Sequence, residues 1–146
     1  MYIEYNPNPI ARKNAMDCPM RAVAKALDTD WESAFAMLCK NAFLMGDSPN
    51  SKVVVDSIIR QNGFKRGIIP NTCPDCYTAK QFCADNPVGV FVLCFDDHIA
   101  TVDNGNLYDA WNSENEVPLF VWYKDNQPKE IRNAATNNRN VQSAGR

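Results

Sequence analysis

Cys18 is the cysteine whose surroundings in the sequence most favour covalent chemistry. Asp17 precedes it and can cap a helix, and Pro19 is tolerated in a first helical turn. The unpaired N–H groups and the dipole at a helix N-terminus favour the thiolate, which is the nucleophilic form of cysteine. Cys18 is therefore a candidate nucleophile. The alternative is a structural cysteine that happens to lie near the start of a helix.

His98 is the only histidine in the chain, and a predicted hairpin brings it close to Asp109. Asn104-Gly105 lies between two apolar runs, which is a strong hairpin signal. A two-residue turn there puts His98, Asp109 and Trp111 on one face, with the Cα atoms of the first two about 7–8 Å apart. Asp109 can then fix the imidazole tautomer, and Trp111 can shield the pair from water. The alternative is a solvated polar pair on a hairpin.

The elements that must position these residues change in type along the chain. Apolar residues at helical spacing predict helices over 17–27, 31–42, 54–63 and 78–86, and period-2 patterns predict strands over 88–95, 98–103, 106–111 and 117–123. Helices followed by antiparallel strands indicate an α+β fold. We expect residues 1–16 to form an extended arm and residues 1–124 to form one domain. The polar, Asn-rich residues 125–146 are expected to form a disordered tail.

Two segments resemble the papain-like cysteine peptidase superfamily. DCPMRAVAKAL (17–27) is similar to its nucleophile helix, and HIATVDNGNLYDAWNS (98–113) is similar to its histidine strand and the strand that follows. In that family an Asn or Asp orients the histidine and a Trp two residues later covers the pair, as Asp109-Ala110-Trp111 would here. The resemblance extends over residues 14–123 and is nearest to the compact members found among bacteriophage and prophage proteins.

The resemblance implies a papain-like fold and a cysteine protease-like hydrolase, a peptidase or isopeptidase with the catalytic triad Cys18, His98 and Asp109. It also implies a protein or peptide substrate, no cofactor or metal, and a viral protein in the cytoplasm of a bacterial host cell. One departure concerns the oxyanion hole, because no Gln precedes the nucleophile. Asn14 is the nearest side-chain amide donor and Arg12 is another possibility, beside the backbone N–H of Cys18.

Composition excludes several other classes of function. The net charge is −2 and the chain has no Lys/Arg block, which argues against binding to a nucleic-acid backbone. No apolar run approaches the ~20 residues of a membrane-spanning helix. The N-terminal segment also lacks the apolar stretch of a signal peptide. A cytosolic protein with six free thiols is therefore expected.

Two alternatives remain open. Cys73-Pro74-Asp75-Cys76 is half of a zinc site, which Cys83 and Cys94 would have to complete. The chain can also keep a papain-like fold without catalysis, as a phage structural module or a module that binds a host protein.

Overall fold

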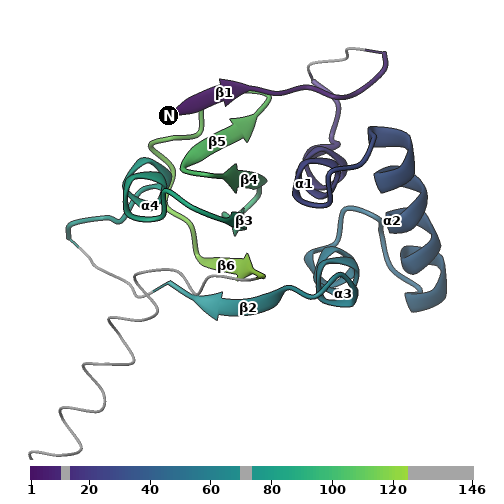
Figure 1. Cartoon of the computed structure of the whole chain (residues 1–146). Coiled ribbons are helices and arrows are strands. Elements are labelled where there is room, and N and C mark those ends of the chain that lie inside the picture. The colour runs from purple at the N-terminus through teal and green to yellow at the C-terminus, as the bar shows by residue number, and fades with distance from the viewer. Residues whose placement is uncertain (11–13, 70–73, 125–146) are drawn as a thin grey trace, which may run out of the picture.

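The computed structural model of the chain describes residues 1–10, 14–69 and 74–124. Within these residues it has four helices and one six-stranded sheet, so the protein is an α+β domain (Figure 1). In chain order the elements are β1 (Tyr2–Glu4), α1 (Cys18–Ala26), α2 (Trp31–Met45), α3 (Lys52–Gln61), β2 (Lys65–Ile68), α4 (Ala79–Asp85), β3 (Val90–Cys94), β4 (Ile99–Asp103), β5 (Asn106–Asp109) and β6 (Phe120–Tyr123). The predicted tail, residues 125–146, lies outside the described residues.

The strands form a sheet in the order β1-β5-β4-β3-β6-β2. Neighbouring strands are antiparallel except for β1 and β5, which run parallel. Two predictions are therefore wrong at the β1 edge of the sheet. Residues 2–4 form a strand of the sheet and not an extended arm, and their pairing with β5 is parallel and not antiparallel. A strand of three residues is too short to show a period-2 pattern, and its partner lies far along the chain, so no local signal in the sequence reveals it.

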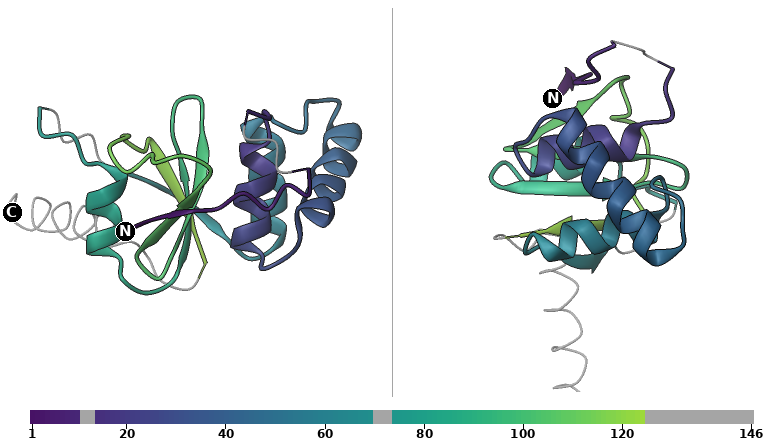
Figure 2. Two further views of the ribbon diagram at one scale, coloured as in Figure 1. Left: turned by 90° about the horizontal axis from the view of Figure 1, so that it is seen from above. Right: turned by 90° about the vertical axis from the view of Figure 1, so that its right-hand side faces the viewer.

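Helices cover both faces of the sheet. In Figures 1 and 2, α1, α2 and α3 lie on one side and α4 lies on the other. The side chains of β3 alternate between these two layers: Val92 and Cys94 pack with α1–α3, whereas Phe91 and Leu93 pack with α4. A strand buried on both faces reads as a continuous apolar run, which is the pattern that residues 88–95 show.

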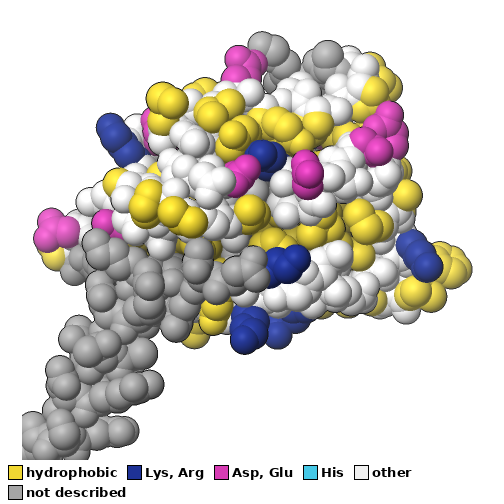
Figure 3. Space-filling view, in the orientation of Figure 1, with side chains coloured by type: hydrophobic (Ala, Val, Ile, Leu, Met, Phe, Trp, Pro, Cys, Tyr) yellow, Lys and Arg dark blue, Asp and Glu magenta, His cyan; other side chains and the backbone are white. Residues whose placement is uncertain are grey.

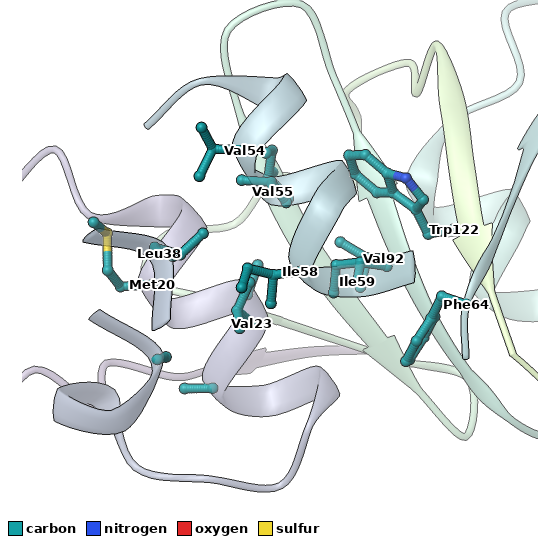
Figure 4. Packing of buried hydrophobic residues seen from close by; sticks show 14 of the residues in the cluster. Met20, Val23, Leu38, Val54, Val55, Ile58, Ile59, Phe64, Val92 and Trp122 are labelled. Carbon is teal, nitrogen blue, oxygen red and sulfur yellow. The ribbon is translucent and has the colours of Figure 1, made fainter. Parts of the chain in front are cut away.

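The core between α1–α3 and the sheet holds the helices in place (Figure 4). Leu38 of α2, Val54 and Ile59 of α3, and Trp122 of β6 are all fully buried there. Burial of each such aliphatic side chain contributes about 1.5–3 kcal/mol. The Trp122 indole N–H also donates to Asp56 Oδ1 at 2.7 Å, which satisfies the one polar group of this large ring.

The β4–β5 hairpin has the register that the sequence predicts. Val102 pairs with Leu107 and Asp103 pairs with Asn106 across a two-residue turn. The turn residues Asn104 and Gly105 have φ values of 48° and 75°, as a type I′ turn requires. This register places the residue that precedes β4, His98, near the end of β5.

The surface seen in Figure 3 carries both basic and acidic side chains, and no histidine appears on it. The absence of histidine there fits the burial of His98, which is 3% exposed. In the described part of the chain, no helix has the length and apolar character needed to cross a membrane.

Candidate active site

Cys18 is the first residue of α1 and is half-buried. The N-cap residue Asp17 does not cap the helix with its side chain, contrary to the prediction. Its Oδ1 lies 2.6 Å from Arg21 Nη2 in a buried ion pair. Its Oδ2 accepts hydrogen bonds from Trp31 Nε1 at 2.9 Å and Asn8 Nδ2 at 3.0 Å. One cation and two buried donors therefore hold the carboxylate away from the helix terminus.

The absence of a side-chain cap sets α1 apart from the other three helices in the described residues. Asp30, Ser51 and Thr78 cap α2, α3 and α4 by accepting a backbone N–H of the first turn. At α1 no side chain does this, and Pro19 has no N–H of its own. The partial positive charge of the helix N-terminus is therefore not offset by a capping side chain, and Cys18 lies beside it.

His98 and Asp109 are joined by a direct hydrogen bond. His98 Nε2 lies 2.6 Å from Asp109 Oδ2, and the two side chains are 3% and 4% exposed. The other carboxylate oxygen, Oδ1, accepts the backbone N–H of Ala110 at 2.7 Å. Because Asp109 occupies Nε2, the ring nitrogen left for any other partner is Nδ1.

The surroundings of His98 favour its charged form. Burial by itself lowers the pKa of His98, but hydrogen bonds with Asp109 and Cys18 and the negative charges of these two residues outweigh burial. Together they raise the pKa from 6.5 to about 9. The surroundings of His98, with Asp109 and Cys18 among the causes, thus favour the imidazolium over the neutral ring.

Ser113 is a site residue that the sequence analysis missed. Its Oγ donates a 2.5 Å hydrogen bond to Asp109 Oδ2, the oxygen that also contacts His98, and the side chain is 1% exposed. Ser113 lies beyond the end of β5 in a segment without periodicity, so no pattern singles it out. Only the return of the chain past Asp109 brings the hydroxyl to the carboxylate.

Trp111 lies against His98, as expected for a side chain that shields the His98–Asp109 pair from water. The ring centroids of His98 and Trp111 are 4.1 Å apart with an interplanar angle of 35°, and Trp111 keeps 43% of its surface exposed. Phe95 is a second aromatic neighbour, with its ring centroid 5.8 Å from that of His98 and an interplanar angle of 17°. Phe95 is the last residue of the strand predicted over 88–95, and the sequence analysis assigned it no part in the site.

A cavity of about 440 Å³ opens beside these groups. Cys18, His98 and Trp111 line it, and the polar side chains Arg21, Asn50, Lys52 and Asp97 complete much of its wall. Asn14, the predicted oxyanion donor, is exposed and is not among the described lining residues. Arg12, the other donor considered, lies outside the described residues.

The structure describes three of the four cysteines of the predicted zinc alternative, and these three lie in different segments of the chain. Cys73 lies outside the described residues, Cys76 is exposed, and Cys83 and Cys94 are buried in separate elements. Burial raises the pKa of both Cys83 and Cys94 to about 11. Among the described residues, no group of three or more His, Cys, Asp or Glu side chains is placed to hold a metal ion.

The protein is therefore an α+β domain in which Cys18 and His98 line one cavity and the buried Asp109 is hydrogen-bonded to His98. Comparison with models of protein families, with curated proteins and with solved structures finds no match to this chain.

Proposed function

We propose that the protein is a cysteine-dependent hydrolase of the papain-like type, acting on amide or isopeptide bonds of a protein or peptide. One observation carries the proposal: the imidazole of His98, which is hydrogen-bonded to Asp109, lines the same cavity as the side chain of Cys18. A nucleophile, a base and a group that orients the base are the parts that acyl transfer through a cysteine needs.

In the acylation half-reaction, the Cys18 thiolate attacks the substrate carbonyl carbon and a C–S bond forms. The carbonyl electron pair moves onto oxygen, and the backbone N–H of Cys18 is the donor that we assign to stabilise that charge. When the tetrahedral intermediate collapses, the C–N bond breaks. The imidazolium of His98 gives its proton to the leaving amine, and a thioester remains on Cys18.

In the deacylation half-reaction, the neutral imidazole of His98 takes a proton from water as the water oxygen attacks the thioester carbon. The C–S bond then breaks, the acid leaves, and the thiolate–imidazolium pair is restored. Asp109 holds the ring through Nε2 in both half-reactions, so that Nδ1 faces the reacting atoms.

The proposal is tested by alkylation of the intact protein with iodoacetamide at pH 6, followed by peptide mapping. An ordinary thiol is mostly protonated at this pH and reacts slowly. Cys18 should therefore be labelled well before Cys39 and Cys76, which are both accessible and serve as internal references. Incubation with p-nitrophenyl acetate should also leave an acetyl group on Cys18.

Variants separate the contributions to this reactivity. His98→Ala should remove most of the preference for Cys18, because the imidazolium is lost while the helix terminus remains. Asp109→Ala should weaken the preference less, because Asp109 acts through the histidine. If Cys18 in the wild-type protein is labelled no faster than Cys39 or Cys76, the hydrolase proposal fails. The domain would then be treated as a binding module.

A further inference from the structure

The wall of the cavity holds two cations that the proposed reaction does not use. Arg21 of α1 and Lys52 of α3 both line it, and Asp97 is the acidic residue among the described lining residues. Cationic side chains in a cleft attract ligands of negative charge, and Asp97 opposes that attraction in part. Arg21 and Lys52 can therefore influence which substrates bind in the cavity.

Arg21 is 4% exposed, yet its hydrogen-bonding capacity is only partly used. Its Nη2 lies 2.6 Å from Asp17 and donates to the backbone carbonyl of Ala15 at 3.2 Å. Within the described part of the chain, Nε and Nη1 are buried and have no hydrogen-bond partner. Unpaired N–H groups of a buried charged side chain destabilise the free protein, so an acceptor supplied by a ligand would offset that cost.

Lys52 carries a charge that no acidic side chain of the described residues neutralises within ion-pair distance. Its Nζ donates to two neutral backbone carbonyls, at 3.0 Å to Phe95 and also to Asp96. These carbonyls follow β3, whereas Arg21 faces Trp111, which follows β5, with its Cζ 5.7 Å from the ring centroid. Since β4 lies between β3 and β5, the two cations approach the cavity from opposite sides.

We propose that the cavity selects substrates that carry a carboxylate close to the reacting carbonyl, as an acidic peptide segment does, and that Arg21 and Lys52 are the residues that recognise it. This inference rests on the proposed hydrolase function and names its substrate class. Nε and Nη1 of Arg21 are closed off from water, so a direct hydrogen bond to them requires a neighbouring side chain to move. Trp111 is one such neighbour, with its ring centroid 5.7 Å from Arg21 Cζ and 43% of its surface exposed.

The test compares two alkylating reagents that differ in charge. Iodoacetate and iodoacetamide react by the same displacement: the C–S bond to Cys18 forms, the C–I bond breaks and iodide leaves. The rate with iodoacetate divided by the rate with iodoacetamide, both measured at Cys18, therefore reports the preference of the cavity for a carboxylate. Lys52→Gln should lower this ratio by roughly 3- to 10-fold, as expected for the loss of one charge several ångströms away. In the wild-type protein the ratio should also fall as salt is added.

Arg21 is tested together with Asp17, because the two side chains form a buried ion pair. Asp17→Asn alone should raise the ratio, since it removes the counter-charge behind Arg21. Relative to Asp17→Asn, the double variant Asp17→Asn, Arg21→Gln should lower the ratio by a factor similar to that of Lys52→Gln. Lys80→Gln, a charge removed from the exposed surface of α4, is the matched control and should leave the ratio unchanged. Thermal unfolding of each variant establishes that it is folded.

Small amino-acid derivatives, added to the wild-type protein, distinguish a side-chain carboxylate from a terminal carboxylate as the group that the cavity recognises. N-acetyl-aspartic acid amide and N-acetyl-alanine present a side-chain and a terminal carboxylate, and N-acetyl-asparagine amide and N-acetyl-alanine amide are their neutral counterparts. Protection of Cys18 from iodoacetamide by one or both acids, and not by the amides, supports the inference. Equal protection by acids and amides overturns it.

Failure of the inference differs from failure of the proposed function. If neutral iodoacetamide does not label Cys18 ahead of the other cysteines, the hydrolase proposal itself fails. Suppose instead that Cys18 is labelled first. If Lys52→Gln keeps the wild-type ratio and the double variant keeps the ratio of Asp17→Asn, or if Lys80→Gln lowers the ratio as much as Lys52→Gln, the hydrolase proposal stands and the carboxylate selectivity is refuted.

Discussion

The proton on His98 offers the sharpest test of the site, because the chain has one histidine and its ring signals need no assignment. The pKa of His98 is raised from 6.5 to about 9. That rise corresponds to about 3 kcal/mol of interactions that favour the imidazolium over the neutral ring. The perturbation is Asp109→Asn, which keeps the shape of the side chain and removes its charge.

The structure gives both the direction and the order of the effects. Burial is the largest single influence and lowers the pKa of His98, and Asp109 opposes it through a hydrogen bond and through its charge. Loss of a carboxylate in contact typically shifts a histidine pKa down by ~1–3 units. In Asp109→Asn, the pKa of His98 should therefore fall from about 9 to roughly 6–8. Cys18→Ser should produce a smaller fall, because each contribution of Cys18 ranks below the matching one of Asp109.

The assay is a pH titration of the ring ¹⁵N and C–H resonances by NMR, from pH 5 to pH 10. In the wild-type protein the ring should stay protonated through neutral pH and lose its proton near pH 9. The ¹⁵N shifts should also show that Nε2 keeps its hydrogen bond to Asp109. A wild-type midpoint close to 6.5, or an equal midpoint in Asp109→Asn, would refute the argument that these neighbours outweigh burial.

Two further predictions concern the framework around the site. Ser113→Ala removes the 2.5 Å hydrogen bond to Asp109 and should lower the free energy of unfolding by about 2 kcal/mol, measured by urea denaturation; no loss would contradict a role in holding the carboxylate. Gly105→Ala puts a Cβ at positive φ and 3.2 Å from the backbone oxygen of Cys83, so it should destabilise the protein more than Gly46→Ala, which meets nothing within 4 Å. We expect about 1 kcal/mol for Gly46→Ala and about 2 kcal/mol or more for Gly105→Ala, and equal losses would be inconsistent with the close approach.

Local patterns in the sequence were enough to predict the hairpin that carries the histidine. Asn104-Gly105 selects a two-residue turn, and a turn of fixed length sets the register of every pair beyond it. The alternation of side chains then places His98 near Asp109, and the observed hydrogen bond between them follows. The helix that begins at Cys18 was predictable for the same reason, since a proline in the first turn and apolar spacing are local signals.

Other features depended on contacts between segments that are far apart in the sequence. Asp17 has the identity of a helix cap, but burial beside Arg21 and Trp31 turns its carboxylate inward, and no local pattern reports that competition. The parallel pairing of β1 with β5 has no local signal either. Asn14 was chosen for its nearness to Cys18 in sequence, but it is exposed and is not among the described residues that line the cavity.

The sequence by itself determined which residues carry reactive groups, where helices α1 to α4 and strands β3 to β6 run, and the register of the hairpin, because these follow from side-chain chemistry and from interactions over a few residues. Ser113 and Phe95 lie only a few residues from their partners Asp109 and His98, but at or beyond the end of a predicted strand, so the sequence did not single them out. Only the tertiary structure decided that Arg21 and Lys52 line one cavity with Cys18 and His98. This arrangement forms when α1 and α3 pack on the sheet, and such packing minimises exposed apolar surface over the whole chain, so it is not encoded at any one position.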